Sequence, residues 1–178
     1  MAAVGFGEGT VKTDLRTGDF FAHQHAGIRP DIITSAKGIA NGFPMGAVLI
    51  APHFEAKKGM LGTTFGGSHL ACAAAIAVAD VVKAENLVEN ARKMGEKIVE
   101  GIKGVSGIKD IRGRGLMIGI DLSVPQAAFR KVLREKHHIM TGLSGEYTLR
   151  LLPPLMIGEK EVERFVEAFK LTAEEMGM

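Results

Sequence analysis

The sequence predicts an α/β protein, and three observations support this fold class. Helix and strand periods alternate over residues 85–178, in the order helix, strand, helix, strand, strand, helix. Of the 178 residues 46% are hydrophobic, which is ample for a buried core. The 23 glycines gather in clusters between apolar runs, which is typical of tight turns.

Charge and cysteine content narrow the class of protein. The chain has 22 basic and 20 acidic residues, with no run of like charge that would bind nucleic acid or a membrane surface. Cys72 is the single cysteine and cannot form an intrachain disulfide. Residues 1–12 lack the basic start and the apolar stretch of a signal peptide. We therefore expect a cytoplasmic protein whose partners are small molecules or copies of itself.

The first third of the chain predicts two strands around a lysine. Residues 1–19 have no apolar period and are expected to form a loop. A β-prone run over 32–34 leads to Lys37, residues 41–42 predict a turn, and residues 45–50 predict a buried strand. Lys37 is therefore expected in or beside a tight, glycine-rich connection between two apolar strands.

Two helices with different surfaces follow. Ser68 is a candidate cap for a helix over 70–82. Almost every side chain of this helix is apolar, so it must be buried on all sides or lie at a subunit interface. The next helix is amphipathic and ends near Gly104. Its apolar stripe consists of Leu87, Ala91, Met94, Ile98 and Ile102.

The last third predicts strands between helices. Large apolar residues occupy every second position over 116–122, which predicts a strand. Ser123 with Gln126 forms a capping-box pattern at the start of a helix over 125–136. Two short strands are expected over 138–141 and 148–152, followed by a helix over 159–176. The buried stripe of that helix consists of Val162, Phe165, Val166 and Phe169.

The residues around Lys37 carry the most specific motif. The run 30–38, Pro-Asp-Ile-Ile-Thr-Ser-Ala-Lys-Gly, precedes Gly-Phe-Pro-Met-Gly-Ala over 42–47. Together they resemble the cofactor-lysine signature of class III aminotransferases, which use pyridoxal phosphate. A covalent bond to the pyridoxal aldehyde requires a neutral amine, and burial favours the neutral form of a lysine. A solvated surface lysine is the alternative interpretation, which the flanking motif disfavours.

Two further motifs resemble the same family. The run 62–67, Gly-Thr-Thr-Phe-Gly-Gly, is similar to the segment whose threonine, here Thr64, reaches the cofactor phosphate of the neighbouring subunit. A turn that only caps a buried helix would look similar. The run 150–155, Arg-Leu-Leu-Pro-Pro-Leu, resembles the segment whose arginine, here Arg150, binds a substrate carboxylate through two parallel hydrogen bonds. An arginine that ends a strand in solvent is the alternative there.

The resemblance implies that the chain is part of a fold-type I aminotransferase of the acetylornithine/ornithine type. Residues 1–78 would be the end of the large cofactor domain, and residues 79–178 the small C-terminal α/β domain. The implied activity moves an amino group from acetylornithine or a related ω-amino donor to a 2-oxo acid, 2-oxoglutarate, through pyridoxal 5'-phosphate. A homodimer is implied as well. The run 112–117 resembles the family's small-domain turn, to which we assign a folding role.

Some expected elements of such a site lie outside these motifs. In the resembled family, the phosphate-binding glycine turn, the aromatic residue on the ring and the aspartate at the pyridine nitrogen belong to a preceding half. Asp31 corresponds to a strand-entry position and is not assigned that role. Four histidines complete no metal-ligand spacing, so no metal site is predicted. We expect weak or absent turnover by this chain alone, and a non-catalytic α/β self-association or partner-binding module remains the alternative.

Overall fold

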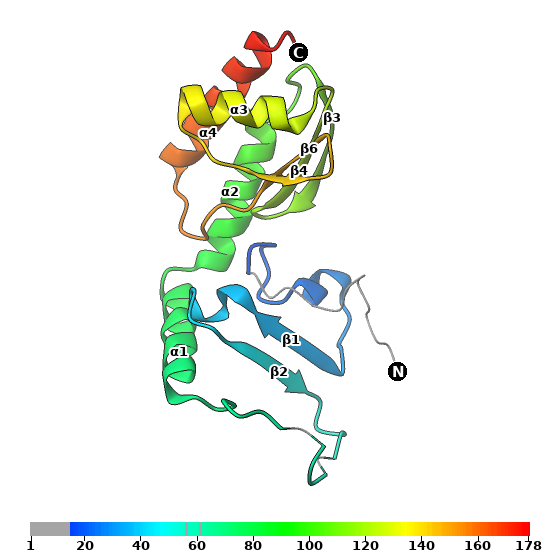
Figure 1. Cartoon of the computed structure of the whole chain (residues 1–178), viewed down its shortest axis with the longest axis vertical. Helices are drawn as coiled ribbons and strands as arrows, with labels where there is room; N and C mark the ends of the chain where they lie inside the picture. Colours follow the sequence, from blue (N-terminus) through cyan, green and yellow to red (C-terminus); the bar gives the residue numbers. More distant parts are fainter. Residues whose placement is uncertain (1–14, 56, 61) are drawn as a thin grey trace. The chain divides into compact units, whose positions relative to one another are not determined.

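The computed structural model describes residues 15–178 except residues 56 and 61. This part of the chain divides into two compact units. The first unit holds Leu15 and residues 19–87, and the second unit holds residues 16–18 and 88–178. Both combine helices with an antiparallel sheet, which confirms the α/β prediction (Figure 1). Residues 1–14 of the loop expected over 1–19 lie outside the described residues, and the domain boundary expected after residue 78 stays a prediction.

A two-stranded sheet forms the centre of the first unit. Strands β1 (Ile32–Ala36) and β2 (Gly46–Ile50) pair antiparallel, from Ile32 opposite Ile50 to Ala36 opposite Gly46. The short helix η2 (Lys37–Ala40) and a turn connect them. A second short helix, η1 (Ala22–Ala26), precedes β1. These elements confirm the predicted pair of strands around Lys37.

The apolar side chains of the first unit are largely exposed. Helix α1 (His69–Ala84) packs against η2, yet only Ala71 and Val82 of this helix are buried. Leu70 is 72% exposed, and Val48 in β2 is 58% exposed. The prediction of a buried strand over 45–50 is therefore wrong for this chain. Of the two alternatives for α1, the described residues do not bury it on all sides, and a subunit interface stays a prediction. The described residues contain too few elements to cover either one.

The second unit is built on a four-stranded antiparallel sheet with the strand order β3-β4-β6-β5. The strands are β3 (Ile108–Arg114), β4 (Met117–Leu122), β5 (Gly142–Ser144) and β6 (Thr148–Leu151). Burial alternates along β4, with Ile118, Ile120 and Leu122 buried. One face of this sheet therefore belongs to the core and the other is open.

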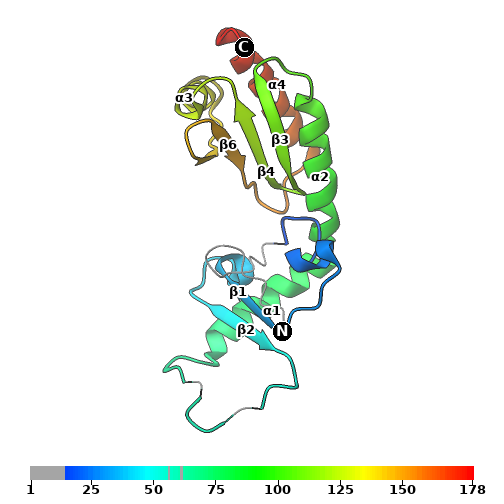
Figure 2. The same cartoon turned by 90° about the vertical axis from the view of Figure 1, so that its right-hand side faces the viewer.

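Three helices supply the rest of this core. They are α2 (Leu87–Ile102), α3 (Gln126–His137) and α4 (Glu159–Glu175), and α2 and α4 run side by side along the sheet (Figures 1 and 2). Phe129 of α3 packs against Phe169 of α4, and both are fully buried. The predicted apolar stripes of α2 and α4 are confirmed. Each large side chain buried here contributes about 1.5–3 kcal/mol.

Helix α2 approaches the turn between β3 and β4 very closely. A Cβ atom added at Gly95 would lie 2.0 Å from the carbonyl oxygen of Gly115. Gly115 itself has a φ of +51°, which favours glycine. This pair of glycines sets the distance between the helix and the turn.

Residues 16–18 form a strap on the second unit. The carbonyl of Arg16 accepts a hydrogen bond from the Leu116 amide at 2.6 Å, and the Arg16 guanidinium donates to the Leu152 carbonyl at 3.1 Å. The second unit is therefore assembled from two stretches of the sequence, separated by the first unit.

One strand of the second unit was missed, and two local predictions there are wrong. Strand β3 was not predicted, because its seven residues contain only two large apolar side chains. The strand expected over 138–141 begins instead at Gly142, because His138 has a φ of +55° and ends α3. The predicted capping box of Ser123 and Gln126 does not form. The side-chain amide of Gln126 donates to the carbonyl of Gly145 instead, and Pro125 is the residue at the cap position.

Candidate functional site

Lys37 is the first residue of η2, directly after β1. Its φ is +60°, an uncommon value for a residue other than glycine and one that costs on the order of 1–3 kcal/mol. Its side chain is exposed. The predicted position in a tight connection is confirmed. The burial that we expected around the amine is not supplied by the residues that the structure describes.

Thr64 lies in the turn over 64–67 that leads into α1, and its side chain is exposed. Ser68 occupies the predicted cap position of α1, but its side chain makes no capping hydrogen bond. Capping by Ser68 is therefore a wrong prediction. Because Ser68 does not cap the helix, the first amide groups of α1 are open to another acceptor. Helix N-termini bind phosphate through such amides.

Arg150 lies on the open face of the sheet in the second unit. Strand register places one residue of each strand in a row, in the order Arg112, Gly119, Arg150, Gly142. The Arg150 guanidinium lies over Gly142, because a Cβ atom built there would be 3.2 Å from Nε and 3.5 Å from Nη2. Among the described residues, Arg150 has no hydrogen-bonding or ionic partner for its side chain.

Arg112, on the same row, is already paired. It donates to both carboxylate oxygens of Asp121, at 2.5 and 3.0 Å, and to Asp110 at 3.1 Å. The Arg112 hydrogen bond, followed by the Thr148 hydroxyl at 2.5 Å, lowers the pKa of Asp121. Hydrogen bonds to Asp121 and Asp110 raise the pKa of Arg112. Arg112 is therefore committed to internal carboxylates, whereas Arg150 is available to an external one.

The sequence predicted Arg150 but missed the cluster of Arg112, Asp121 and Thr148. A signal was present, because Asp121 is a polar residue in the alternating pattern of β4. That pattern indicates the open face, but it does not reveal which residues of β3 and β6 lie beside it. Strand register supplies that information.

Two histidines of the first unit have a carboxylate nearby. His25 lies 2.9 Å from Asp19, and His53 lies 3.5 Å from Asp31. No group of three or more possible metal ligands occurs in the described part of the chain. Over the same residues, no helix has both the length and the apolar character needed to cross a membrane.

The structure divides the three predicted site residues between the two units. Lys37 and Thr64 belong to the first unit, where η2 packs against the helix that follows Thr64. Arg150 belongs to the second unit. The side chains of Lys37 and Thr64 are both exposed, and the roles predicted for them belong to two different cofactor molecules.

Comparison with known proteins identifies the family. The model of the family "Aminotransferase class-III" matches residues 11–172. An acetylornithine aminotransferase of Corynebacterium efficiens is 43% identical over 171 residues, covering 93% of this chain and 42% of the relative. An acetylornithine aminotransferase of Methanosarcina mazei is 36% identical, covering 87% and 40% respectively. The chain thus spans about two fifths of the length of these curated relatives.

Solved structures agree with this result. Ornithine delta-aminotransferase of Plasmodium falciparum superposes with a TM-score of 0.81 at 28% identity, covering 92% of this chain and 46% of that one. A Bacillus anthracis aminotransferase gives a TM-score of 0.80 at 30% identity, covering 93% and 43%. This fold and the family match over most of the chain lead to one conclusion: the protein belongs to the class III aminotransferases, which depend on pyridoxal phosphate.

Proposed function

We propose that this chain is the C-terminal part of an aminotransferase that moves an amino group from acetylornithine, or a related ω-amino donor, to 2-oxoglutarate. The single observation that carries the proposal is the position of Lys37. It stands in a left-handed conformation at the end of β1, inside the segment that matches the family. The names of the curated relatives support acetylornithine as the donor.

Lys37 has two tasks in this proposal. Its Nζ atom would hold the aldehyde carbon of pyridoxal phosphate, and once substrate displaces it the same amine would take up the proton of the substrate α-carbon. When bound, the cofactor supplies an electron-withdrawing ring that stabilises charge on the α-carbon. The left-handed backbone of Lys37 fixes the point from which this side chain leaves the end of β1.

Thr64 and Arg150 hold the two anionic groups. The Thr64 hydroxyl, with the first amides of α1, would bind the cofactor phosphate of a second copy in a homodimer. The Arg150 guanidinium would bind a substrate carboxylate through two parallel hydrogen bonds, which its unpaired state on the open sheet face permits. Arg112 is excluded from this role by its two aspartates.

A second candidate function is a non-catalytic α/β module. The observation that favours it is the closed core of the second unit, where Phe129, Leu133 and Phe169 are fully buried without help from the first unit. Such a unit can persist as a binding or self-association domain. Cofactor binding distinguishes the two functions.

The test is cofactor capture by the full chain. Pyridoxal phosphate should produce a visible absorption band that borohydride removes, with the reduced adduct found on Lys37 by mass spectrometry. Lys37→Ala should abolish the band, whereas Lys83→Ala, at an exposed lysine of α1, should keep it. An adduct on another lysine with Lys37 unmodified contradicts the assignment, and no adduct at all favours the module.

A further inference from the structure

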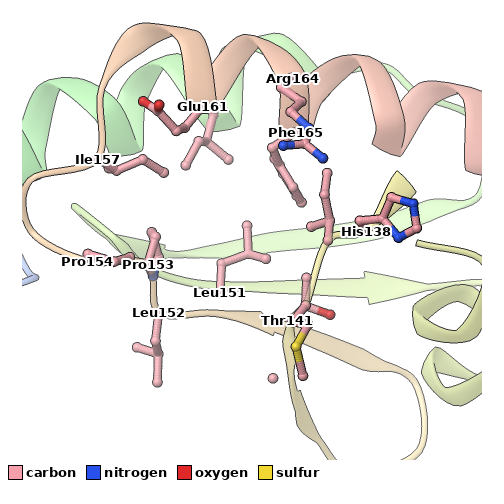
Figure 3. A pocket seen from close by; sticks show the side chains of 14 residues that line it. His138, Thr141, Leu151, Leu152, Pro153, Pro154, Ile157, Glu161, Arg164 and Phe165 are labelled. Carbon is pink, nitrogen blue, oxygen red and sulfur yellow. The ribbon is translucent and has the colours of Figure 1, made fainter. Parts of the chain in front are cut away.

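The second unit contains a pocket of about 400 Å³ that includes none of the proposed aminotransferase residues. Small-molecule sites range from about 300 to 1,000 Å³, so its size suits a small ligand. One wall comes from α4, with Glu161, Arg164 and Phe165 (Figure 3). The facing wall comes from the end of β6 and the segment before β5, including Leu151 and Thr141.

The floor of this pocket is apolar. Ile98, Leu151 and Phe165 are between 2% and 8% exposed and belong to the hydrophobic core. Ile139 and Ile157 are partly buried and pack against the same core. A ligand in this pocket would therefore place an apolar body against the floor.

Thr141 provides a polar group without a partner. Its Oγ1 atom is buried and makes no hydrogen bond to any residue that the structure describes. Its backbone is held in place, because the Arg130 guanidinium donates to the Thr141 carbonyl at 3.1 and 2.8 Å. A buried hydroxyl left unpaired costs about 1–3 kcal/mol. Because Oγ1 has almost no accessible surface, the rest of the Thr141 residue lines the pocket.

The charged groups at the rim differ in availability. Arg164 donates one hydrogen bond, from Nη2 to the His137 carbonyl at 3.0 Å. Its Nε and Nη1 atoms have no partner within the described part of the chain. The carboxylate of Glu161 accepts from the Gly158 amide at 3.0 Å and thereby caps α4. The rim thus offers a partly free guanidinium to an anion, beside a carboxylate that disfavours a highly charged one.

We propose that this pocket binds a small monocarboxylate with an apolar body. The body lies on the floor formed by Ile98, Leu151 and Phe165. The carboxylate accepts hydrogen bonds from Arg164. A phosphate-bearing ligand fits less well, because its double charge would lie near Glu161.

Fluorine NMR of two matched probes on the full chain tests the proposal. The first probe is para-fluorophenylpropionate, and the second is para-fluorophenylpropanol, which has the same body and no carboxylate. The propionate should broaden saturably on titration, with a Kd at least about tenfold below that of the alcohol, because a hydrogen bond to a charged group is worth roughly a factor of ten or more. Binding of neither probe at millimolar concentration overturns the proposal.

Matched variants assign the contacts. Arg164→Gln should weaken propionate binding about tenfold and leave the alcohol unchanged. Arg134→Gln, at an exposed arginine of α3 that pairs with Glu135, should change neither. Thr141→Val keeps the side-chain shape and removes the unpaired hydroxyl. The free protein should melt at the same or a higher temperature, and propionate binding should change less than in Arg164→Gln, because the hydroxyl has no surface open to the pocket.

Two outcomes would show that the pocket is merely an apolar groove. One is equal binding of both probes, and the other is an equal effect of the two arginine variants. Because every variant is first compared with wild type by its melting temperature, weaker binding cannot be mistaken for unfolding.

Discussion

At the scale of single residues, the position of the Arg150 side chain depends on residue 142 being a glycine, which has no Cβ atom. A Cβ atom at residue 142 would lie 3.2 Å from the Arg150 Nε atom, a contact tight enough to push the guanidinium by a few tenths of an ångström. Gly119 is the neighbour on the other side of Arg150, and a Cβ atom there would meet only ordinary contacts of 3.5 Å or more. The two glycines of one row therefore have different roles.

Substitution of these glycines should separate the roles. Gly142→Ala should displace Arg150, which would shift its Nε–H resonance in a nitrogen-correlated NMR spectrum. Gly119→Ala should leave that resonance in place and raise the free energy of unfolding by about 0.5–1 kcal/mol, because alanine in a strand loses less entropy on folding. An unchanged Arg150 resonance in Gly142→Ala would contradict the predicted contact.

Asp121 predicts a pH dependence of stability. Its pKa in the folded chain is lowered by Arg112 and Thr148, so its stabilising effect is present above the ordinary value of 3.8 and is lost as pH falls through the folded pKa. Asp121→Asn should therefore lower the melting temperature at pH 7, with a deficit that shrinks below pH 3.8. Glu163→Gln, at an exposed carboxylate of α4, is the control. A deficit that is constant with pH would argue against the ionised pair.

At the scale of elements, the contact between α2 and the β3–β4 turn is the tightest constraint. Alanine at Gly95 gains about 1 kcal/mol of helix propensity, but its Cβ atom would collide with the Gly115 carbonyl. Gly95→Ala should lower the free energy of unfolding by about 1–3 kcal/mol, as overpacking does. Urea denaturation measures this change. Glu96→Ala, at an exposed position of the same helix, should stay within about 0.5 kcal/mol of wild type.

Helices with strong periodic patterns were predictable from the sequence. The stripe from Leu87 to Ile102 predicted α2, and the stripe from Val162 to Phe169 predicted α4, because a 3.6-residue period identifies both the element and its buried face. Strand β3 was not predictable in this way. Only two of its side chains are large and apolar, and its pairing with β4 is a long-range property.

The residues of the candidate site were predictable only where they lie within a specific sequence motif. The roles of Lys37 and Arg150 were predicted from the sequence motifs around them. The pairing of Arg112 with Asp121 depends instead on strand register. The left-handed backbone of Lys37 could not be predicted either, because lysine has no preference for it. Burial of the first unit was predicted wrongly, because an apolar run does not specify which chain segment covers it.

At the scale of the whole molecule, exposed apolar surface predicts self-association. Leu70 and Ile76 of α1 are 72% and 62% exposed, and each large side chain left in water forgoes about 1.5–3 kcal/mol. Light scattering at micromolar concentration should give a dimer or a larger species. Ile76→Lys should reduce the mass, whereas Leu171→Lys, at a 47% exposed leucine of α4, should not. A monomer with a sharp cooperative melt would contradict this expectation.

The strap of residues 16–18 makes the second unit discontinuous in the sequence. Arg16 bonds to Leu152, 136 positions later, although residues 19–87 between them belong to the first unit. A single cut at the exposed turn near Lys58 would leave a two-piece protein, with the early piece retained through the strap and through the packing of η2 against α1. The backbone of the first unit is therefore a covalent tether that keeps the strap at high effective concentration beside Leu116. Without that tether, the same few hydrogen bonds and the contact of η2 with α1 would have to hold two separate molecules together.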